Sequence, residues 1–573
     1  MSKDVSVKTE RVDDIPLLFA ELKRMGVQEL LDKYFPAHGN RQGLSMGEVA
    51  VVWLSHILSQ ADHRMNHVQN WVENHIESIG RSLGKELVGL DLSDDRLGNV
   101  LKDISDDIKW KGFESELTQK QVQVYDLKPE RVRLDSTTAS GYWEENKEGL
   151  LQRGHSKDHR PDLSQVKIML ATLDPLGLPI ASQILSGNRS DDGLYIPAVE
   201  QVRETLDKRG LLYVGDCKMG SLNTRQMIQA GGDYYLCPLS KNQVSAEAMQ
   251  QYLLAIKEEK VKLEEVSYEY ANGKIEVIAK GYEQVHTCYS QGEDAEYTWE
   301  ERRLVVYSMS HAKSGKATLQ ARIDKTNKEL EALNQPCRGK KPSSDLESFT
   351  KLATNIIAHN RVQSLFALDF HEQIEQRTQR AYRDRPARVI EKRLFRVDYT
   401  INSDALDSQM QSLGWRVYAT NHPLADLSLA QAVGVYRQEF LIEHGFGRLK
   451  GQPLSLAPMF LQREDHIKGL IRLLTIGLRL LTLVEFQVRR AIFLEQNSLA
   501  GLYAGNPKRA TTQPTTERIL AAFKEITLVF IDSGTEIYAH LTSLSPLQLK
   551  ILQLLNFPLE IYTRLLLQSD HPP

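Results

Sequence analysis

Residues 131–137 have the sequence RVRLDST, which predicts a short buried strand that ends in an acid, Asp135. Residues 211–216, LLYVGD, predict a second strand that also ends in an acid, Asp216. A carboxylate at a strand end lies at the rim of a sheet, where side chains can converge on a ligand. A lone acid in such a place is more often a turn or cap residue. A functional role for this pair is therefore supported only if the surrounding elements place the two acids in one site.

The segments around these two strands predict the order of a sheet. Along the chain they are strands at 166–174 and 178–185, a helix at 191–210, a helix at 221–232 and a strand at 233–239. With the two acid-bearing strands this gives β-β-β-α-β-α-β, the arrangement of an RNase H-like α/β core with a mixed sheet. Acids then stand on the first and fourth strands, which predicts that Asp135 and Asp216 share one site.

The rest of the chain predicts several further parts, as expected for 573 residues. Ser45-x-x-Glu48 is a capping box that begins a helix in a helical N-terminal domain. GWRVYAT (414–420) predicts a strand that returns to the core after a β-rich insertion. The predicted parts are the N-terminal domain (1–125), the first part of the core (126–240), the insertion (241–400), the last part of the core (401–460) and a helical C-terminal region (461–573).

Composition excludes some classes of protein. The formal net charge of −4 gives no sign of nucleic-acid binding, so any basic surface must be local. The cysteines form no C-x-x-C pair, which argues against a zinc ribbon or a disulfide scaffold and favours a reducing cytosol; they are Cys217, Cys237, Cys288 and Cys337. The apolar segment 467–486 contains Lys468, Arg472 and Arg479, so it predicts a buried amphipathic helix rather than a membrane span. The polar start of the chain argues against a secretory signal.

Two strand-end carboxylates and a third acid from a helix would form a site for a hard cation. Mg²⁺, for which Mn²⁺ can substitute, prefers carboxylate oxygens and water. Two such ions, roughly 3.5–4 Å apart, suit phosphodiester chemistry because they act on both the attacking and the leaving oxygen. We therefore expect two Mg²⁺ ions and look for the third acid after the insertion.

The segment YRQEFLIEHGFGRLKG (436–451) resembles the signature of insertion-sequence DDE transposases: Tyr, two residues, Arg, three residues, Glu, six residues, Lys. Tyr436, Glu443 and Lys450 match this spacing, and on one helix they would lie within about 40° of one another. The resemblance implies that Glu443 is the third metal ligand and that Tyr436 and Lys450 contact DNA phosphates. Segments 154–167, 186–192 and 501–520 resemble the long-chain subgroup with a helical N-terminal domain.

The signature position for Arg is occupied by Glu439. Arg437 lies nearby in the sequence but about 100° around a helix from Tyr436. Glu439 is therefore a rival third ligand, although the Lys450 spacing favours Glu443. Gly445 and Gly447 each weaken a helix by roughly 1 kcal/mol relative to Ala, so the helix could bend or end before Lys450.

Two basic segments are candidates for DNA contact. Residues 377–396 contain eight Arg or Lys and two acids, which is typical of phosphate binding but equally of a solvated helix face. Arg383 and Arg388 are the candidate DNA-binding residues in this segment. Lys157 and Arg160 follow the first strand and could hold the cleaved DNA strand. His155 and His159 have a spacing seen in zinc sites, but the surrounding Gly and Pro predict a loop without further ligands.

The resemblance implies a DNA transposase that binds terminal inverted repeats, cuts DNA and joins the freed 3′-hydroxyl to target DNA. It also implies a homodimer that holds two ends, N-terminal helices that recognise DNA, and a place in the prokaryotic cytoplasm with the nucleoid rather than at a membrane. Two alternatives stay open: an RNase H-like nuclease or resolvase, and a catalytically silent, transposase-derived DNA-binding protein.

Overall fold

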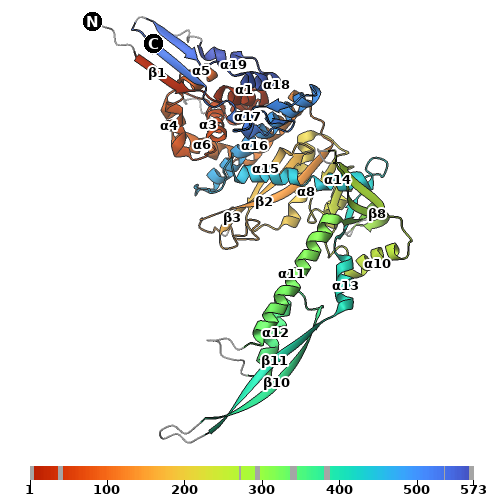
Figure 1. Cartoon of the computed structure of the whole chain (residues 1–573). Helices are drawn as coiled ribbons and strands as arrows, with labels where there is room; N and C mark the ends of the chain where they lie inside the picture. The colour runs from red at the N-terminus through yellow and green to blue at the C-terminus, as the bar shows by residue number, and fades with distance from the viewer. Residues whose placement is uncertain are drawn as a thin grey trace.

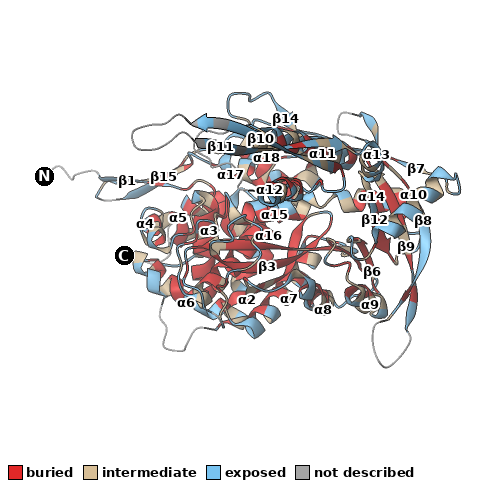
Figure 2. Ribbon diagram, turned by 90° about the horizontal axis from the view of Figure 1, so that it is seen from below, coloured by how far each residue is buried: buried red, intermediate tan, exposed pale blue. Residues whose placement is uncertain are grey.

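The computed structural model has a body from which a long arm projects, and the first strand, β1 (Ser6–Arg11), and the last helix, α19 (Glu560–Thr563), lie at the part of the body away from the arm (Figure 1). The residues that the structure describes are 6–36, 43–146, 148–269, 273–290, 297–335, 345–379, 388–534 and 536–566. Buried residues are concentrated in the body around α3 (Met46–Gln60), α16 (Glu464–Leu494) and β3 (Ser164–Leu173) (Figure 2). The ribbon of β10 (Phe366–Gln379) and β11 (Arg388–Ile401) is largely exposed, although Phe366 and Val397 are buried.

A nine-stranded mixed sheet forms the centre of the body, in the order β4-β3-β2-β5-β6-β12-β9-β8-β7. Strand β2 pairs antiparallel with β3 and parallel with β5, and β5 pairs parallel with β6. The strand order third, second, first, fourth, fifth confirms the predicted RNase H-like core. The bounds of these five strands are β2 (Arg131–Gly141), β3 (Ser164–Leu173), β4 (Leu178–Ser186), β5 (Leu212–Val214) and β6 (Tyr234–Pro238).

Strand β12 (Trp415–Thr420) lies between β6 and β9 and pairs antiparallel with both. The predicted return of residues 414–420 to the core is therefore confirmed. Because β12 bridges the two halves, strands from the first part of the insertion continue the core sheet; they are β7 (Glu264–Glu269), β8 (Ile275–Tyr289) and β9 (Thr298–Ser308). Helix α10 (Ala246–Lys257) precedes them.

Helices enclose the core half of the sheet. The capping box at Ser45 is present and begins α3 (Met46–Gln60). The other N-terminal helices are α1 (Ile15–Met25), α2 (Val27–Tyr34), α4 (Val68–Glu73), α5 (Ile76–Leu83), α6 (Asp94–Ile104) and α7 (Asp107–Val124). Within the sheet region, α8 (Tyr195–Leu206) and α9 (Leu222–Ala230) follow the predicted order.

Helix α16 (Glu464–Leu494) runs through the body and is buried over most of its length, which confirms the predicted buried helix. Its internal charges have partners: Arg472 donates to the Ile104 carbonyl at 2.8 Å, and Arg479 lies 3.3 Å from the carboxylate of Glu114. In the described part of the chain, no helix combines the length and apolar character needed to cross a membrane.

The C-terminal region (461–573) contains the predicted helices and, in addition, short strands that the sequence did not predict. Strand β1 (Ser6–Arg11) pairs with β15 (Thr527–Asp532), which pairs with β16 (Ile537–Leu541), so the two ends of the chain share one small sheet. The first four residues of β15, TLVF, alternate between intermediate and buried, as expected for a strand with one face on the core. The remaining elements are β13 (Leu499–Ala500), β14 (Ala510–Thr511), α17 (Thr516–Ala521), α18 (Pro546–Leu554) and α19 (Glu560–Thr563).

The arm consists of residues 309–412 and has a small hydrophobic core of its own, which includes Leu319, Phe349 and Val397. Its strands β10 (Phe366–Gln379) and β11 (Arg388–Ile401) form a separate two-stranded antiparallel ribbon. Its helices are α11 (Met309–Leu333), α12 (Leu346–His359) and α13 (Ser403–Ser412). Helix α11 leaves the body directly after β9, and α13 returns the chain to β12 (Figure 1).

Candidate active site

The register of two parallel strands brings Asp135 and Asp216 together. Strands β2 and β5 pair through Arg133 and Val214, and each acid follows its strand's residue by two positions. Neighbouring strands lie about 4.8 Å apart, so the two carboxylates leave the sheet side by side. The sequence predicted that the first strand ends at Asp135, but β2 continues to Gly141. It continues because β3 goes on pairing with it after β5 has ended.

Asp135 is held by one backbone amide and one lysine. The Ser136 N–H donates to its Oδ1 at 2.7 Å, and the Lys157 ammonium lies 3.5 Å from the same oxygen. Burial raises the pKa of Asp135, the charge of Lys157 opposes this rise, and the nearby Asp216 carboxylate adds to it. The repulsion between the two acids is thus only partly compensated by the protein.

Asp216 is oriented by the start of α8 and by its own loop. The Tyr195 hydroxyl donates to Oδ1 at 2.6 Å, and the Lys218 N–H donates to the same oxygen at 2.8 Å. Burial, followed by the charge of Asp216, raises the pKa of Tyr195 well above its usual range, so the phenol remains a donor. Both bonds fix one oxygen of Asp216 and leave Oδ2 for another ligand.

The signature segment does not form one helix. Helix α14 (Leu429–Arg437) ends before the acids, and α15 (Phe440–Lys450) begins after a two-residue joint. Across the joint the Leu441 N–H donates to the Gln438 carbonyl at 3.0 Å, a three-residue spacing that tightens the turn.

The joint is placed by packing. Leu429 and Val433 of α14 belong to a cluster with the strands β5 and β6, whereas Ile442 and Phe446 of α15 belong to the main core of the body. The two helices therefore follow different surfaces. Helix α15 itself continues through its glycines to Lys450, so the helix breaks before the acids rather than after them.

Glu439 lies in the joint and Glu443 lies in the first turn of α15, and their surroundings differ. Glu439 is half-buried, and burial, then the charges of Asp135, Glu443 and Asp216, raises its pKa. Glu443 is exposed one turn further along α15. Arg133 fixes α14 to the sheet beside them, because its guanidinium donates to the Val435 carbonyl at 2.8 Å.

The predicted DNA-contacting lysines lie next to the acids. Lys157 donates to the Ser136 carbonyl at 2.6 Å as well as approaching Asp135. Lys450, at the end of α15, forms an ion pair with Asp158 at 2.6 Å. The two lysines therefore come from distant parts of the sequence to adjacent positions at the rim of the site.

The other predicted contacts are more scattered. The ring of Tyr436 lies 4.8 Å from that of Tyr418, and Arg437 is exposed. Arg160 is exposed and pairs with Asp162 at 2.8 Å. Arg388 begins β11 on the arm, away from these acids (Figure 1), whereas Arg383 lies outside the described residues.

A cation that the sequence did not single out lies close to the tyrosine of the signature. Arg416 on β12 is on the same strand face as Tyr418, since side chains alternate along a strand. Burial raises the pKa of Tyr418, and the charge of Arg416 opposes this rise. The sequence predicted that Arg416 lies on a strand. It did not predict which strands β12 pairs with, and so it did not place Arg416 near the site.

A buried network supports the loop that follows Asp216. The carboxylate of Glu301 accepts hydrogen bonds from Arg225 and, at 2.8 Å, from the Tyr235 hydroxyl. Arg225 also donates to the Gly220 carbonyl at 3.0 Å. Ligand atoms of His286, Cys288 and Glu301 lie within 4.8 Å of one another, but the Glu301 charge is already paired, so this group serves the loop rather than a cation.

The acids fit a divalent cation. Asp135 and Asp216 offer hard oxygen ligands from neighbouring strands, and Glu439 and Glu443 add more from the joint. The charge of Lys157 lowers the pKa of Asp135, and that of Arg133 lowers the pKa of Glu439. Burial and repulsion between the acids still raise both pKa values above their usual range. A bound divalent ion would relieve that repulsion.

Comparison with known proteins identifies related families. A family model described as a transposase DDE domain matches residues 127–480, and one described as a domain of unknown function matches residues 7–113. No curated protein matches the chain. Among solved structures, the cryo-electron microscopy structure of a piggyBac transposase synaptic complex with hairpin DNA is 9% identical, with a TM-score of 0.21; the match covers 47% of this chain and 62% of that one, less than two thirds of its length.

Proposed function

The chain belongs to the transposase DDE domain family, and we propose that it is an insertion-sequence transposase that cuts DNA at the ends of its element and joins them to target DNA. One observation carries the proposal beyond the family: Asp135 and Asp216 follow an in-register pair on neighbouring parallel strands at the place where the sheet opens. Phosphodiester chemistry with metal ions needs such an arrangement of carboxylates.

We assign Asp135, Asp216 and Glu443 as the ligands of two Mg²⁺ ions, for which Mn²⁺ can substitute. When bound, the cations supply the charge that stabilises both the attacking and the leaving oxygen. The chain's own residues keep the acids in place: Tyr195 and the Lys218 amide hold Asp216, and the Ser136 amide holds Asp135.

Positively charged side chains near the acids are the proposed contacts to the DNA strand. Lys157 and Lys450 stand at the rim of the acids and are positioned to contact phosphates beside the cut bond, with Tyr436 on the other side of the joint. The bonds of these lysines to Asp158 and to the Ser136 carbonyl would be exchanged for phosphate contacts when DNA binds. Arg437, Arg160 and the arm residue Arg388 would add contacts further away.

The partners follow from the proposed reaction. The DNA substrates are the terminal inverted repeats and a target duplex, and a homodimer would hold the two ends together. The N-terminal helices α1 to α7 are the proposed end-recognition domain. The proposed location is the prokaryotic cytoplasm with the nucleoid.

Removal of one sheet acid tests the proposal. Protein would be incubated with Mg²⁺, target DNA and linear DNA that carries the inverted repeats flanking its gene. We expect wild type to cut and join these ends, and Asp135→Asn to lose cutting by on the order of 1,000-fold while DNA binding remains. Asp162→Asn, which changes an exposed acid on the neighbouring loop, is the matched control and should cut normally.

Each contrary result has a distinct meaning. Undiminished cutting by Asp135→Asn would exclude the assigned metal site. Cutting without joining would favour an RNase H-like nuclease or resolvase. Binding without cutting by the wild-type chain would favour a catalytically silent DNA-binding protein.

The third ligand is tested by a pair of isosteric changes. We expect Glu443→Gln to reduce cutting by at least about 100-fold and Glu439→Gln by no more than about 10-fold, because only the former removes the assigned ligand. Titration with Mn²⁺ would show a weakened metal response for Glu443→Gln. The opposite ranking would transfer the third-ligand role to Glu439, which faces both sheet acids.

A further inference from the structure

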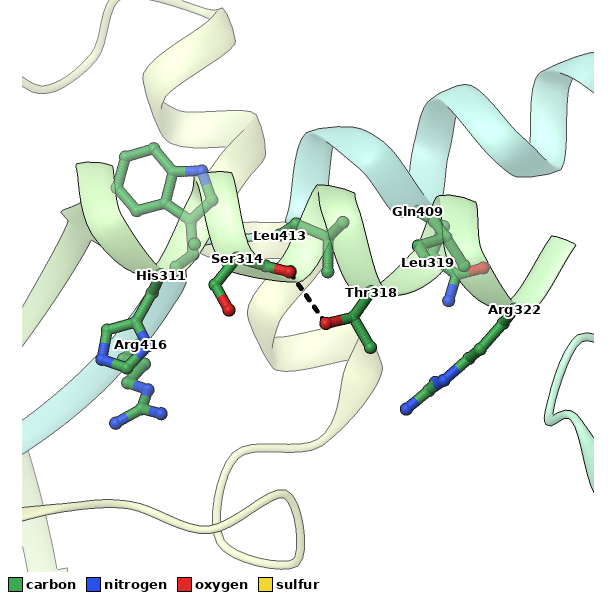
Figure 3. Close-up of a pocket in the computed structure, with 11 residues that line it drawn as sticks. His311, Ser314, Thr318, Leu319, Arg322, Gln409, Leu413 and Arg416 are labelled. Carbon is green, nitrogen blue, oxygen red and sulfur yellow. Dashed lines mark hydrogen bonds between the residues drawn. The ribbon is translucent and has the colours of Figure 1, made fainter. Parts of the chain in front are cut away.

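A polar cavity of about 340 Å³ lies at the base of the arm, between α11, α13 and β12. His311, Ser314, Thr318 and Arg322 line it from α11, Gln409 from α13 and Arg416 from β12. Figure 3 shows His311 and Arg416 side by side at one end of the cavity and Arg322 at the other, further along the same helix. The cavity therefore presents cations at both ends of a polar floor.

The turn from α13 into β12 brings these groups together. Gly414 in this turn has a φ of 93°, a conformation that other residues rarely adopt. A Cβ on Gly414 would lie 2.6 Å from the Cβ of Ala312 on α11, so only glycine allows the turn to pack directly on that helix. This close approach places Arg416, two residues later, against His311.

The cavity is positively charged and its charge is not neutralised by the protein. His311, Arg322 and Arg416 are its ionisable lining residues, and no acid is among the lining residues. In the described parts of the chain no carboxylate forms an ion pair with Arg322, Arg416 or Arg437. Burial lowers the pKa of His311, and the charges of Arg416 and Arg437 lower it further, which places Arg437 in the same cationic group.

The cavity adjoins the candidate active site. Arg416 and Tyr418 share a face of β12, and Tyr418 contacts Tyr436 of the signature at 4.8 Å between ring centroids. The charge of Arg416 also acts on Cys217, which directly follows Asp216. A strand that crosses the acids toward the arm would thus pass the tyrosine pair and reach Arg416 first.

We propose that this cavity binds the phosphate groups of a DNA strand that continues from the Asp135–Asp216 site along the base of the arm. The proposal deepens the proposed function and rests on it. Arg416 then supplies from β12 the positive charge that position 439 lacks, because Glu439 stands where the signature has Arg. Phosphate is the ligand that fits, since arginines beside hydroxyl and amide groups bind its oxygens through charge-assisted hydrogen bonds.

The test measures the salt dependence of DNA binding. A fluorescein-labelled duplex of arbitrary sequence, and the single strand of the same sequence, would be titrated with the full chain in EDTA at several KCl concentrations. Each lost phosphate contact lowers the slope of log K against log salt by about 0.9 for duplex and about 0.7 for single strands. We expect a fall of about one contact for Arg416→Gln and about two for Arg416→Gln with Arg322→Gln.

Lys313→Gln is the matched control. Lys313 is exposed on α11, two positions from His311 and about 200° around the helix, so it faces away from the cavity. Its slope should equal that of wild type. Thermal melting of every variant would verify that a changed slope does not come from unfolding.

The outcomes separate this proposal from the proposed function. An unchanged slope for the double variant, or an equal fall for Lys313→Gln, would overturn the cavity assignment even if wild type cuts DNA. A changed slope with no cutting by wild type would retain the cavity and reject the transposase activity. A fall seen with the single strand alone would identify unpaired DNA as the ligand, and a fall with both would identify the backbone that they share.

Discussion

In the body, buried arginines are each held by a carboxylate, whereas the cations at the base of the arm face a cavity without one. Arg133 pairs with Asp174 at 2.7 Å, Arg448 with Glu517 at 2.8 Å and Arg479 with Glu114 at 3.3 Å. Arg322 and Arg416 line an open polar cavity instead. Buried charges in the body therefore hold the fold together, while those at the base of the arm are left for a ligand.

The two regions also differ in how they are packed. The main core of the body joins the N-terminal helices, the sheet and α16 in one continuous cluster. The arm has its own cluster between α11, α12, β10 and β11. Because little apolar surface links the two cores, damage to one should leave the other folded.

The largest effect is expected from an unpaired charge in the body. Glu114 accepts hydrogen bonds from the Ser182 N–H at 2.9 Å and from its hydroxyl at 2.7 Å, and it neutralises Arg479 on α16. Glu114→Gln leaves Arg479 buried without its counter-charge, so we expect the body to lose about 3–5 kcal/mol of unfolding free energy. Urea denaturation would measure the loss.

The paired change sharpens this result. Glu114→Gln combined with Arg479→Met removes both charges, and the double variant should regain most of the lost stability because no buried charge stays uncompensated. A double variant as unstable as Glu114→Gln alone would show that packing, rather than charge, dominates at this site.

A smaller and confined effect is expected in the arm. Phe349 packs against Phe395 with ring centroids 5.8 Å apart and against Phe370 at 6.4 Å. Phe349→Ala should destabilise the arm by about 3 kcal/mol, at the lower end for this change because a small core can partly collapse. Hydrogen exchange would become faster in β10 and β11 and stay unchanged in β2 to β6; faster exchange in both would contradict the separation of the two cores.

The smallest effect on stability is expected from the cavity cations. Arg416 is exposed and its charge is not paired with a carboxylate among the described residues, so Arg416→Gln should change the unfolding free energy by no more than about 0.5 kcal/mol. The same variant should show the altered salt dependence of DNA binding. A melting temperature several degrees below that of wild type would instead mark Arg416 as a structural residue of the body.

Local patterns were sufficient for part of the site. The strand order and the positions of Asp135 and Asp216 could be predicted because apolar runs and the acids that follow them are local in the sequence. The joint at 438 and 439 could not, because it arises where α14 and α15 turn to different cores. The neighbours of Asp216 were missed for a similar reason: Tyr195 reaches it from the start of a helix whose sequence predicted only packing.

The RNase H-like order of the core elements, the buried helix α16 and the positions of the two sheet acids could be predicted from the sequence, because each depends on short-range periodicity. Three features required the folded chain: β12 lies between β6 and β9, the charges of Asp135 and Asp216 act on Glu439, and Arg416 and His311 line one cavity. These are contacts between residues far apart in the chain. They are set by how whole elements pack, and no local pattern records them.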